Sequence, residues 1–190
     1  MSVIFKAACL LVGDRGSGKN QVLQSYVKNI YNDSEEIDEF EKFERMENVK
    51  GKSIQCKYYT SDMEDYERIK EKRYEGIDVI LACYSIVDIS TFRNLQEKWI
   101  PEIQAITKEI PIIVVGTHVD QIMTTHRGRG FVSIDAPRQL TERYKLSSCI
   151  EVSAKTERNL VSLFKEVGSL ALDRRRKELT AKSSKGCVIC

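Results

Sequence analysis

The sequence contains no apolar run long enough to cross a bilayer, since a membrane-spanning helix needs about 20 consecutive apolar residues. It also has no basic region ahead of its apolar N-terminus, so we expect residues 3–12 to form a buried strand rather than a signal peptide. Hydrophobic residues make up 42% of the 190 residues and charged residues 31%. This composition predicts a single soluble globular domain with a sizeable core.

The chain has little excess charge of either sign, because its net charge is only +2, but the charges are unevenly distributed. From Asp33 to Glu47 there are eight acidic and two basic residues. From Asp173 to Cys190 there are six basic and two acidic ones. Runs of this kind are most often solvated surface, so each needs an argument from its position before it indicates a function.

The chain has six cysteines. Four of them lie in apolar, strand-like segments: Cys9, Cys56, Cys83 and Cys149. These are expected to be small buried hydrophobic residues, and without a secretory signal the expected compartment is the reducing cytosol. Cys187 and Cys190 form a C-x-x-C within the last four residues, which fits a redox or metal pair as well as a C-terminal lipidation motif.

Apolar strand-like runs alternate with segments of helical periodicity along the whole chain. Strands are predicted at residues 3–12, 49–59, 78–87, 111–116 and 149–152, and helices at 19–30, 64–74, 91–106, 136–144 and 160–172. The helix at 91–106 carries Phe92, Leu95, Trp99 and Ile103 on one face. Near-continuous apolar strands separated by helices predict an α/β fold, in which a mostly parallel sheet is covered on both faces.

A glycine-rich motif follows the first predicted strand and precedes the first predicted helix: Gly13-Asp14-Arg15-Gly16-Ser17-Gly18-Lys19-Asn20. It fits G-x-x-x-x-G-K, the phosphate-binding loop or P-loop, in the context that this motif requires. Its glycines permit backbone angles that point successive N–H groups at an anion, and Lys19 adds a positive charge for the β and γ phosphates. All eight residues are predicted to contact nucleotide phosphates.

The eighth position of the motif normally carries Ser or Thr, whose hydroxyl binds Mg²⁺, but here it is Asn20. An amide oxygen also binds hard cations, although it sits on a longer side chain and is placed differently. Asn20 is therefore a possible metal ligand.

Four further segments resemble the Rho proteins of the Ras superfamily. Residues 64–69 resemble the second switch, 97–103 the third-helix signature, 115–120 the guanine-reading loop T-K-x-D, and 151–155 the S-A-K loop. The resemblance covers essentially the whole chain and is weakest between residues 29 and 51. It implies a small G-protein domain at residues 1–172, with a six-stranded mostly parallel sheet, followed by a polybasic hypervariable tail at 173–190.

The resemblance also assigns guanine binding to six residues: Thr117, His118, Asp120, Ser153, Ala154 and Lys155. Asp120 can accept hydrogen bonds from the ring N–H and the exocyclic amine of guanine, which adenine does not offer. In the family, the backbone N–H at the position of Ala154 meets the guanine oxygen. His118 stands where the family has a lysine whose stem covers the base.

Several groups that the family uses for Mg²⁺ and hydrolysis are missing. The family's second switch begins D-x-x-G-Q, but Met63 stands at the Gln position and cannot orient water. Tyr59 stands at the Asp position. The strand alternation of Ile54, Cys56 and Tyr58 indicates instead that one residue is deleted there, and under either alignment the Asp is absent.

No threonine lies between Asn20 and Tyr59 to serve as the first-switch ligand of Mg²⁺, and an acidic run occupies this region instead. The resemblance also places Arg15 where a glycine leaves room for the attacking water and a partner's arginine finger. We therefore expect no catalytic residue, and weak or dispensable Mg²⁺ binding. A metal site rebuilt from Asp62 or from an acid of the first switch stays open as an alternative.

The last four residues, Cys187-Val188-Ile189-Cys190, fit a C-a-a-X box with a basic stretch upstream. A single lipid anchors weakly, but each nearby base adds about 1 kcal/mol at an anionic membrane, so the two together suffice for stable anchoring. Prenylation of Cys187 and location on the cytoplasmic face of membranes are predicted. The final Cys190 leaves the lipid type open.

Three interpretations remain open at this point. The first is a membrane-anchored signalling protein that binds GTP or GDP, hydrolyses GTP little or not at all, and acts through effector and regulator proteins. The second is a pseudo-GTPase adaptor that binds nucleotide weakly or never. The third is a different P-loop enzyme, such as a small-molecule kinase, which the base-reading loops and the C-terminal box disfavour.

Overall fold

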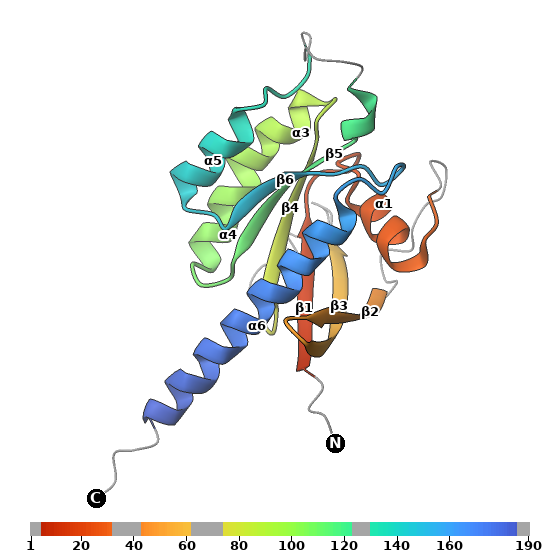
Figure 1. The fold of residues 1–190 in the computed structure, drawn as a ribbon. Helices are drawn as coiled ribbons and strands as arrows, with labels where there is room; N and C mark the ends of the chain where they lie inside the picture. Colours follow the sequence, from red (N-terminus) through yellow and green to blue (C-terminus); the bar gives the residue numbers. More distant parts are fainter. Residues whose placement is uncertain (1–4, 32–42, 62–73, 123–129, 186–190) are drawn as a thin grey trace, which may run out of the picture.

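The computed structural model describes residues 5–31, 43–61, 74–122 and 130–185, and its strands form one sheet (Figure 1). The six strands are β1 (Phe5–Val12), β2 (Phe43–Val49), β3 (Lys52–Ser61), β4 (Val79–Ser85), β5 (Ile112–Thr117) and β6 (Ser148–Glu151). Their order in the sheet is β2-β3-β1-β4-β5-β6. β2 and β3 are antiparallel, and every other neighbouring pair is parallel. The prediction of a six-stranded, mostly parallel α/β sheet is thus confirmed.

Helices cover both faces of the sheet. On one face lie α1 (Lys19–Leu23) with its π-helical continuation η1 (Gln24–Lys28), and α6 (Leu160–Lys185). On the other lie α3 (Ile89–Asn94), η3 (Leu95–Trp99), α4 (Ile100–Ile106) and α5 (Ala136–Tyr144). The face predicted for residues 91–106 is correct, because all four of its apolar side chains are buried.

The sheet separates two apolar cores, and strand alternation decides which core each side chain enters. On β3, Ile54, Cys56 and Tyr58 are buried in the core beneath α6, as their alternation predicts. Burial raises the pKa of the Cys56 thiol to about 11 and that of the Cys83 thiol to about 12, so both are neutral at pH 7. Cys149 differs from the other three strand cysteines because it is only partly buried.

The strand predicted at 49–59 after a Lys50-Gly51 turn is β3, and it forms a hairpin with β2, which was not predicted. Lys50 and Gly51 form the turn, with φ of 52° and 73°, and β2 precedes it. β2 overlaps the end of the acidic run, and the charged residues of this strand obscure its alternation of buried and exposed positions. Phe43, Glu47 and Val49 point inward and are buried. The acidic run is therefore not uniformly solvated surface.

The buried Glu47 carboxylate is satisfied by two tyrosines. Tyr26 Oη donates a 2.7 Å hydrogen bond to Glu47 Oε1, and Tyr58 Oη lies 3.4 Å from the same atom. The Tyr26 ring stacks on Phe164 of α6 at 3.8 Å, and the guanidinium of Arg45 lies 4.4 Å from the Tyr26 ring centre. Glu47 thereby joins β2 to η1, β3 and α6, since an inward acid needs such partners to be tolerated.

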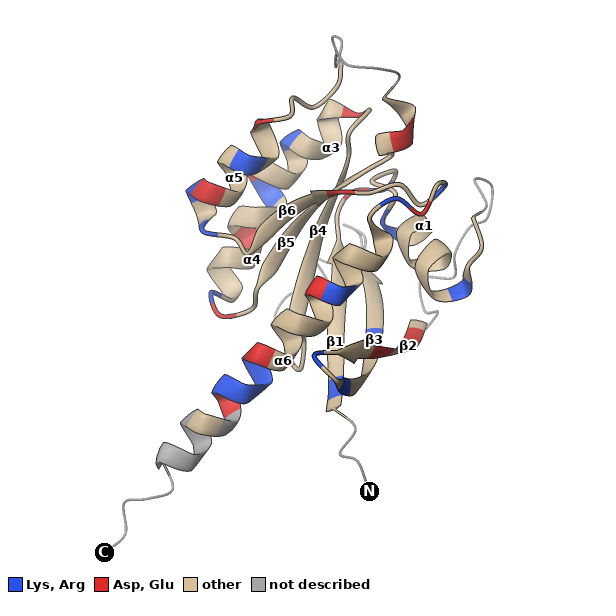
Figure 2. Ribbon diagram, viewed as in Figure 1, with Lys and Arg blue, Asp and Glu red and all other residues tan. Residues whose placement is uncertain are grey.

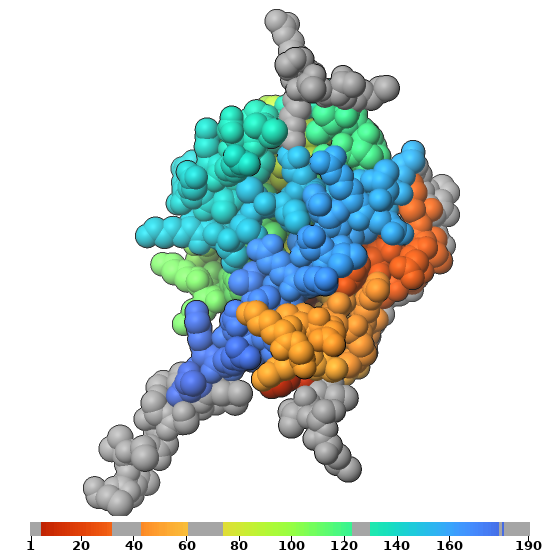
Figure 3. Space-filling view, viewed as in Figure 1, coloured from red at the N-terminus to blue at the C-terminus, as the bar shows by residue number. Residues whose placement is uncertain are grey.

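The last helix extends beyond its predicted end at residue 172 and runs to Lys185, so residues 183–185, expected to be a flexible tail, are helical. In Figure 3, α6 crosses one face of the domain beside the β2–β3 hairpin and projects beyond it. None of the described helices, α6 included, is long and apolar enough to cross a membrane.

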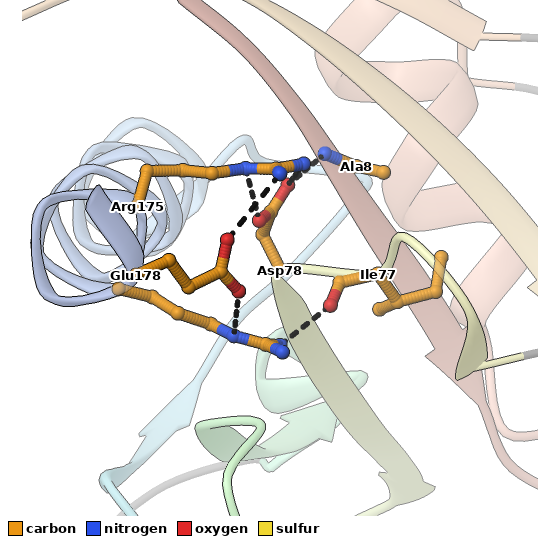
Figure 4. A network of polar contacts seen from close by, with 6 residues as sticks. Ala8, Ile77, Asp78, Arg175 and Glu178 are labelled. Carbon is orange, nitrogen blue, oxygen red and sulfur yellow. Dashed lines mark hydrogen bonds and ion pairs between the residues drawn. The ribbon is translucent and has the colours of Figure 1, made fainter. Parts of the chain in front are cut away.

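A polar network attaches the basic half of α6 to the sheet (Figure 4). The Asp78 side chain is 2% exposed, and its Oδ1 lies 2.7 Å from Arg175 Nε. Its Oδ2 accepts hydrogen bonds from the Ala8 N–H at 2.9 Å and from Arg175 Nη2 at 3.0 Å. Arg174 donates to the Ile77 carbonyl at 2.6 Å, and Glu178 pairs with both arginines. These contacts hold the basic part of α6 against the sheet.

Burial raises the pKa of Asp78 above its usual value, although the Ala8 N–H and the Arg175 guanidinium lower it. A raised folded-state pKa means that the stability due to protonation is present below the unfolded-state pKa and is lost as pH rises through the folded-state pKa. The ionised carboxylate thus bears a net burial cost at neutral pH. In the fold this carboxylate accepts the Ala8 N–H and pairs with Arg175.

We predict that Asp78→Ala lowers the free energy of unfolding by about 2 kcal/mol, because it leaves the Ala8 N–H without an acceptor. Asp78→Asn keeps an acceptor oxygen and removes the buried charge, so it should cost less than about 1 kcal/mol. Urea unfolding at pH 7 measures both. Asp173→Ala, which removes an exposed pair with Lys50, is the matched control and should cost about 0.5 kcal/mol or less. Equal losses for Asp78→Asn and Asp78→Ala would contradict this account.

Candidate functional site

Three loops meet at the edge of the sheet where the parallel strands end. They follow β1, β5 and β6, and they contain residues 13–18, 118–120 and 152–155. Thr117 Oγ1 donates to the Ser17 carbonyl at 2.7 Å, and Ser25 Oγ donates to the Ala154 carbonyl at 2.7 Å. The structure therefore brings the predicted phosphate and base loops together, at the place where open α/β sheets bind ligands.

The loop after β1 requires glycine at two positions for lack of space. A Cβ atom at Gly13 would lie 2.3 Å from the Cys83 carbonyl oxygen. A Cβ atom at Gly18 would lie 2.8 Å from both Thr117 Oγ1 and His118 Cε1. All three glycines of the loop have positive φ, 146° at Gly13, 82° at Gly16 and 74° at Gly18, which side chains disfavour.

This backbone leaves donors for an anion. Apart from the Ser17 N–H, which donates to the Asp14 carbonyl at 3.1 Å, the loop makes few internal bonds. The N–H groups of Gly16 and Gly18 have no acceptor within the described ranges. Lys19 is 4% exposed, and its Nζ lies 3.3 Å from the Asp14 carbonyl, so its ammonium group is held beside the loop. Such converging N–H groups and a fixed cation suit a phosphate chain.

The carboxylate of Asp14 is turned away from this cradle toward α3 and η3. Asp14 Oδ1 accepts a 2.8 Å hydrogen bond from Trp99 Nε1, and Oδ2 accepts a 2.6 Å hydrogen bond from Asn94 Nδ2. Two donors thus hold the negative charge away from the predicted phosphate position. Among the loop residues predicted to contact phosphate, Asp14 offers only its backbone there.

Two buried polar atoms, one in the loop and one at the start of α1, lack a partner among the described residues. Ser17 Oγ and Asn20 Oδ1 are both buried, and neither has a hydrogen-bond partner among the described residues. Unsatisfied buried groups in native proteins point to a missing partner, so both atoms fit a site that is completed by a ligand. Asn20 Oδ1 is an oxygen of the type that hard cations accept. Elsewhere in the described ranges, no group of three or more His, Cys, Asp or Glu side chains is placed to hold a metal ion.

The loop after β5 is held by side-chain bonds around His118. This residue has a left-handed backbone, with φ of 62°, and its Nδ1 lies 2.9 Å from Thr117 Oγ1 and 3.0 Å from Ser85 Oγ. Its Nε2 lies 3.3 Å from Gln21 Oε1 on α1. The imidazole therefore rests against α1 and Gly18.

The base-reading groups keep unused hydrogen-bonding capacity. Asp120 lies in the short 3₁₀ turn η4 (Val119–Gln121), and its Oδ1 accepts a 2.6 Å hydrogen bond from Ser153 Oγ. Asp120 Oδ2 and the Ala154 N–H have no partner among the described residues. Ser153 is fully buried, whereas Lys155 is exposed. A free carboxylate oxygen and a free N–H at one edge match the donor and acceptor pattern of guanine.

Some predicted positions are not tested by this geometry. Arg15 is exposed, and Met63, Asp62 and Cys187 lie outside the described residues. The acidic run is described only from Phe43 onward.

Sequence reasoning missed the residues that support the loops: Gln21, Ser25, Ser85, Asn94 and Trp99. Only Trp99 carried a usable signal, because a buried indole N–H needs an acceptor and Trp99 was already placed on a buried face. The others are short polar side chains whose partners are far away in the sequence.

The comparisons with known proteins agree with this site. The Ras family profile matches residues 8–173. The Rho-related GTP-binding protein RhoV of Rattus norvegicus is 31% identical over 194 residues, which cover 96% of this chain and 82% of RhoV. RhoV from Mus musculus and from Homo sapiens shows the same identity and coverage. The chain therefore belongs to the Ras family of small GTP-binding proteins, and within it to the Rho-like members.

Proposed function

We propose that this chain is a membrane-anchored Rho-like signalling protein that binds GTP and GDP, hydrolyses GTP very slowly or not at all, and acts by binding effector proteins. The observation that supports the proposal is that the loop at residues 13–18 meets the loops of Asp120 and Ala154 at one edge of the sheet. Guanine nucleotide binding is common to the family, so the specific claims concern hydrolysis, metal dependence and anchoring.

In this proposal the backbone N–H groups of Gly16 and Gly18 bind the phosphates, and Lys19 neutralises part of their charge. Asp120 Oδ2 accepts from the guanine ring while Ser153 holds Oδ1. The Ala154 N–H donates to the guanine oxygen. Thr117, His118 and Lys155 line the base, with His118 held in place from α1.

The rate of GTP hydrolysis depends on the groups around the γ-phosphate. Bound Mg²⁺ would neutralise phosphate charge, and Asn20 Oδ1 is the described atom suited to hold it. The family's metal-shell Asp is absent, whether Tyr59 stands at its position or one residue is deleted there. Tyr59 packs against the core beside α3 and α4, and it offers no carboxylate for Mg²⁺. Arg15 is exposed beside the cradle, where the family needs open space. We infer binding with little dependence on Mg²⁺ and without efficient turnover.

A pseudo-GTPase adaptor that binds nucleotide weakly is the second candidate. The same two substitutions, Asn20 and Tyr59, favour it, because Mg²⁺ normally offsets the repulsion between phosphates. The retained glycine geometry and the unused base-reading groups favour binding. The amount of nucleotide carried by the purified protein distinguishes the two.

We predict no phosphate release from GTP above the buffer background, with or without a GTPase-activating partner, because Met63 cannot orient the attacking water. Single-turnover phosphate release by the purified full chain measures this. Lys19→Ala serves as the control without a cradle cation. Mg²⁺-dependent turnover that Lys19→Ala abolishes would refute the proposal.

We predict that protein denatured after purification releases GDP or GTP, identified by anion-exchange chromatography. Asp120→Ala should lower the bound nucleotide at least about a hundredfold, because it removes a charged acceptor of two hydrogen bonds. Asp173→Ala, on an exposed part of α6, should leave it unchanged. Recovery of ATP would overturn the guanine assignment, and an empty protein would favour the adaptor.

We predict that Cys187→Ser releases the chain from membranes in a fractionation experiment. The basic stretch alone adds only about 1 kcal/mol for each base near the surface, and part of it is engaged by the domain. Cys190→Ser retains the C-a-a-X cysteine and is the matched control, expected to stay on membranes. Unchanged association of Cys187→Ser would exclude the anchor.

A further inference from the structure

A second cavity lies at the end of the sheet opposite the nucleotide loops. It has a volume of about 270 Å³, close to the lower limit of about 300 Å³ for small-molecule sites. Its described lining comes from α4 and the connection to β5, from the connection between α5 and β6, and from α6. No residue of the predicted phosphate or base loops contributes to it, so it is separate from the site described above.

Basic residues outnumber acidic ones among the residues that line this cavity. Four bases line it: Lys108, Lys145, Arg174 and Lys177. In Figure 2 basic segments appear in the α4–β5 and α5–β6 connections and on α6, and Figure 3 shows the α4–β5 connection beside the C-terminal half of α6 on one face. The bases come from three separate parts of the chain, so the fold, and not a local run, gathers them.

Most of this positive charge is not neutralised within the domain. The ammonium groups of Lys108, Lys145 and Lys177 have no ion-pair or hydrogen-bond partner in the described part of the chain. Of the two acids in the lining, Asp173 is already paired with Lys50 at 3.3 Å, which leaves Glu109. Like charges that converge on one cavity repel each other, and an anion relieves that repulsion.

One wall is rigid and the floor is partly apolar. Arg174 donates to the Ile77 carbonyl at 2.6 Å and pairs with Glu178 at 3.3 Å, so its guanidinium is fixed before any ligand arrives. Pro111, Leu146 and Leu170 supply apolar surface beneath the cations. A fixed guanidinium and mobile ammonium groups above apolar surface suit a phosphate group carried on a compact carbon ring.

We propose that this cavity binds a phosphomonoester of a compact polyol, with Lys108, Lys145 and Lys177 contacting the phosphate oxygens. Such a group exists both as the headgroup of a membrane lipid and as a soluble polyphosphate. The chain leaves the domain at this end, along α6 toward Cys187, so a headgroup is within reach when the protein is anchored. Only this last step rests on the proposed anchor.

The test titrates inositol hexakisphosphate into the unlipidated full chain as purified and follows backbone amide signals by NMR. We expect shifts at residues 108–110, 112 and 145–147. The double variant Lys108→Ala/Lys145→Ala should weaken binding about tenfold or more, because it removes two unpaired cations. Both side chains are exposed and without partners, so this variant should fold, as circular dichroism would verify.

The control variant Lys6→Ala/Lys165→Ala makes the same change in net charge at two exposed lysines outside the cavity. It should alter the affinity less than about twofold. An equal loss of affinity in both double variants would show that binding is due to general charge attraction, and it would overturn the proposed site. Shifts confined to residues 13–20, or no binding at all, would overturn it as well.

Vesicles distinguish the two sources of the phosphate. Phosphatidylcholine vesicles containing phosphatidylinositol bisphosphate are compared with phosphatidylserine vesicles of equal surface charge. Preference for the former that Lys108→Ala/Lys145→Ala removes supports a lipid headgroup. Cavity-dependent binding of the soluble probe without that preference supports a soluble polyphosphate. Because neither readout uses nucleotide turnover, failure here leaves the proposed function untouched.

Discussion

A methyl group at residue 13 would lie 2.3 Å from the Cys83 carbonyl, and one at residue 18 would lie 2.8 Å from side-chain atoms of Thr117 and His118. The loop between β1 and α1 can therefore approach β4 and β5 only because these positions have no side chain. That approach lets Thr117 bond the Ser17 carbonyl and brings the base-reading loop beside the phosphate cradle.

Helices and strands were predictable where their own residues carry a regular apolar pattern. Features that depend on contacts with residues distant in the sequence were not predictable. α5 has the predicted bounds, and β4 and β5 were recognisable because strands covered on both faces consist of continuous apolar residues. β2 was missed because an inward glutamate interrupts its pattern. For the candidate site, the motif predicted the loop between β1 and α1, whereas the guanine contacts assigned from the resemblance stay predictions. It could not predict that Trp99 and Asn94 would hold the Asp14 carboxylate, since no local pattern encodes a contact across 80 residues or more.

Glu47 shows how an acidic run can serve the fold. An isolated buried carboxylate would be costly, but the Tyr26 hydroxyl and a pair with Arg45 at 3.9 Å compensate this one. Tyr26 lies on η1, which continues the helix after the phosphate loop, and its ring stacks on Phe164. Its contacts therefore link that helix to both Glu47 and α6. The acidic residues of the run thus differ in role, and a count of charges cannot separate them.

The basic residues of α6 divide in the same way. Arg174 and Arg175 hold the helix against Ile77 and Asp78. Lys177, one turn or less away, has no side-chain partner in the described part of the chain and lines the second cavity. Because Arg174 and Arg175 fix this part of α6, they also fix the position of Lys177 at the cavity. A cation held by a rigid helix presents a defined geometry to an anion, which a flexible tail with the same net charge cannot do.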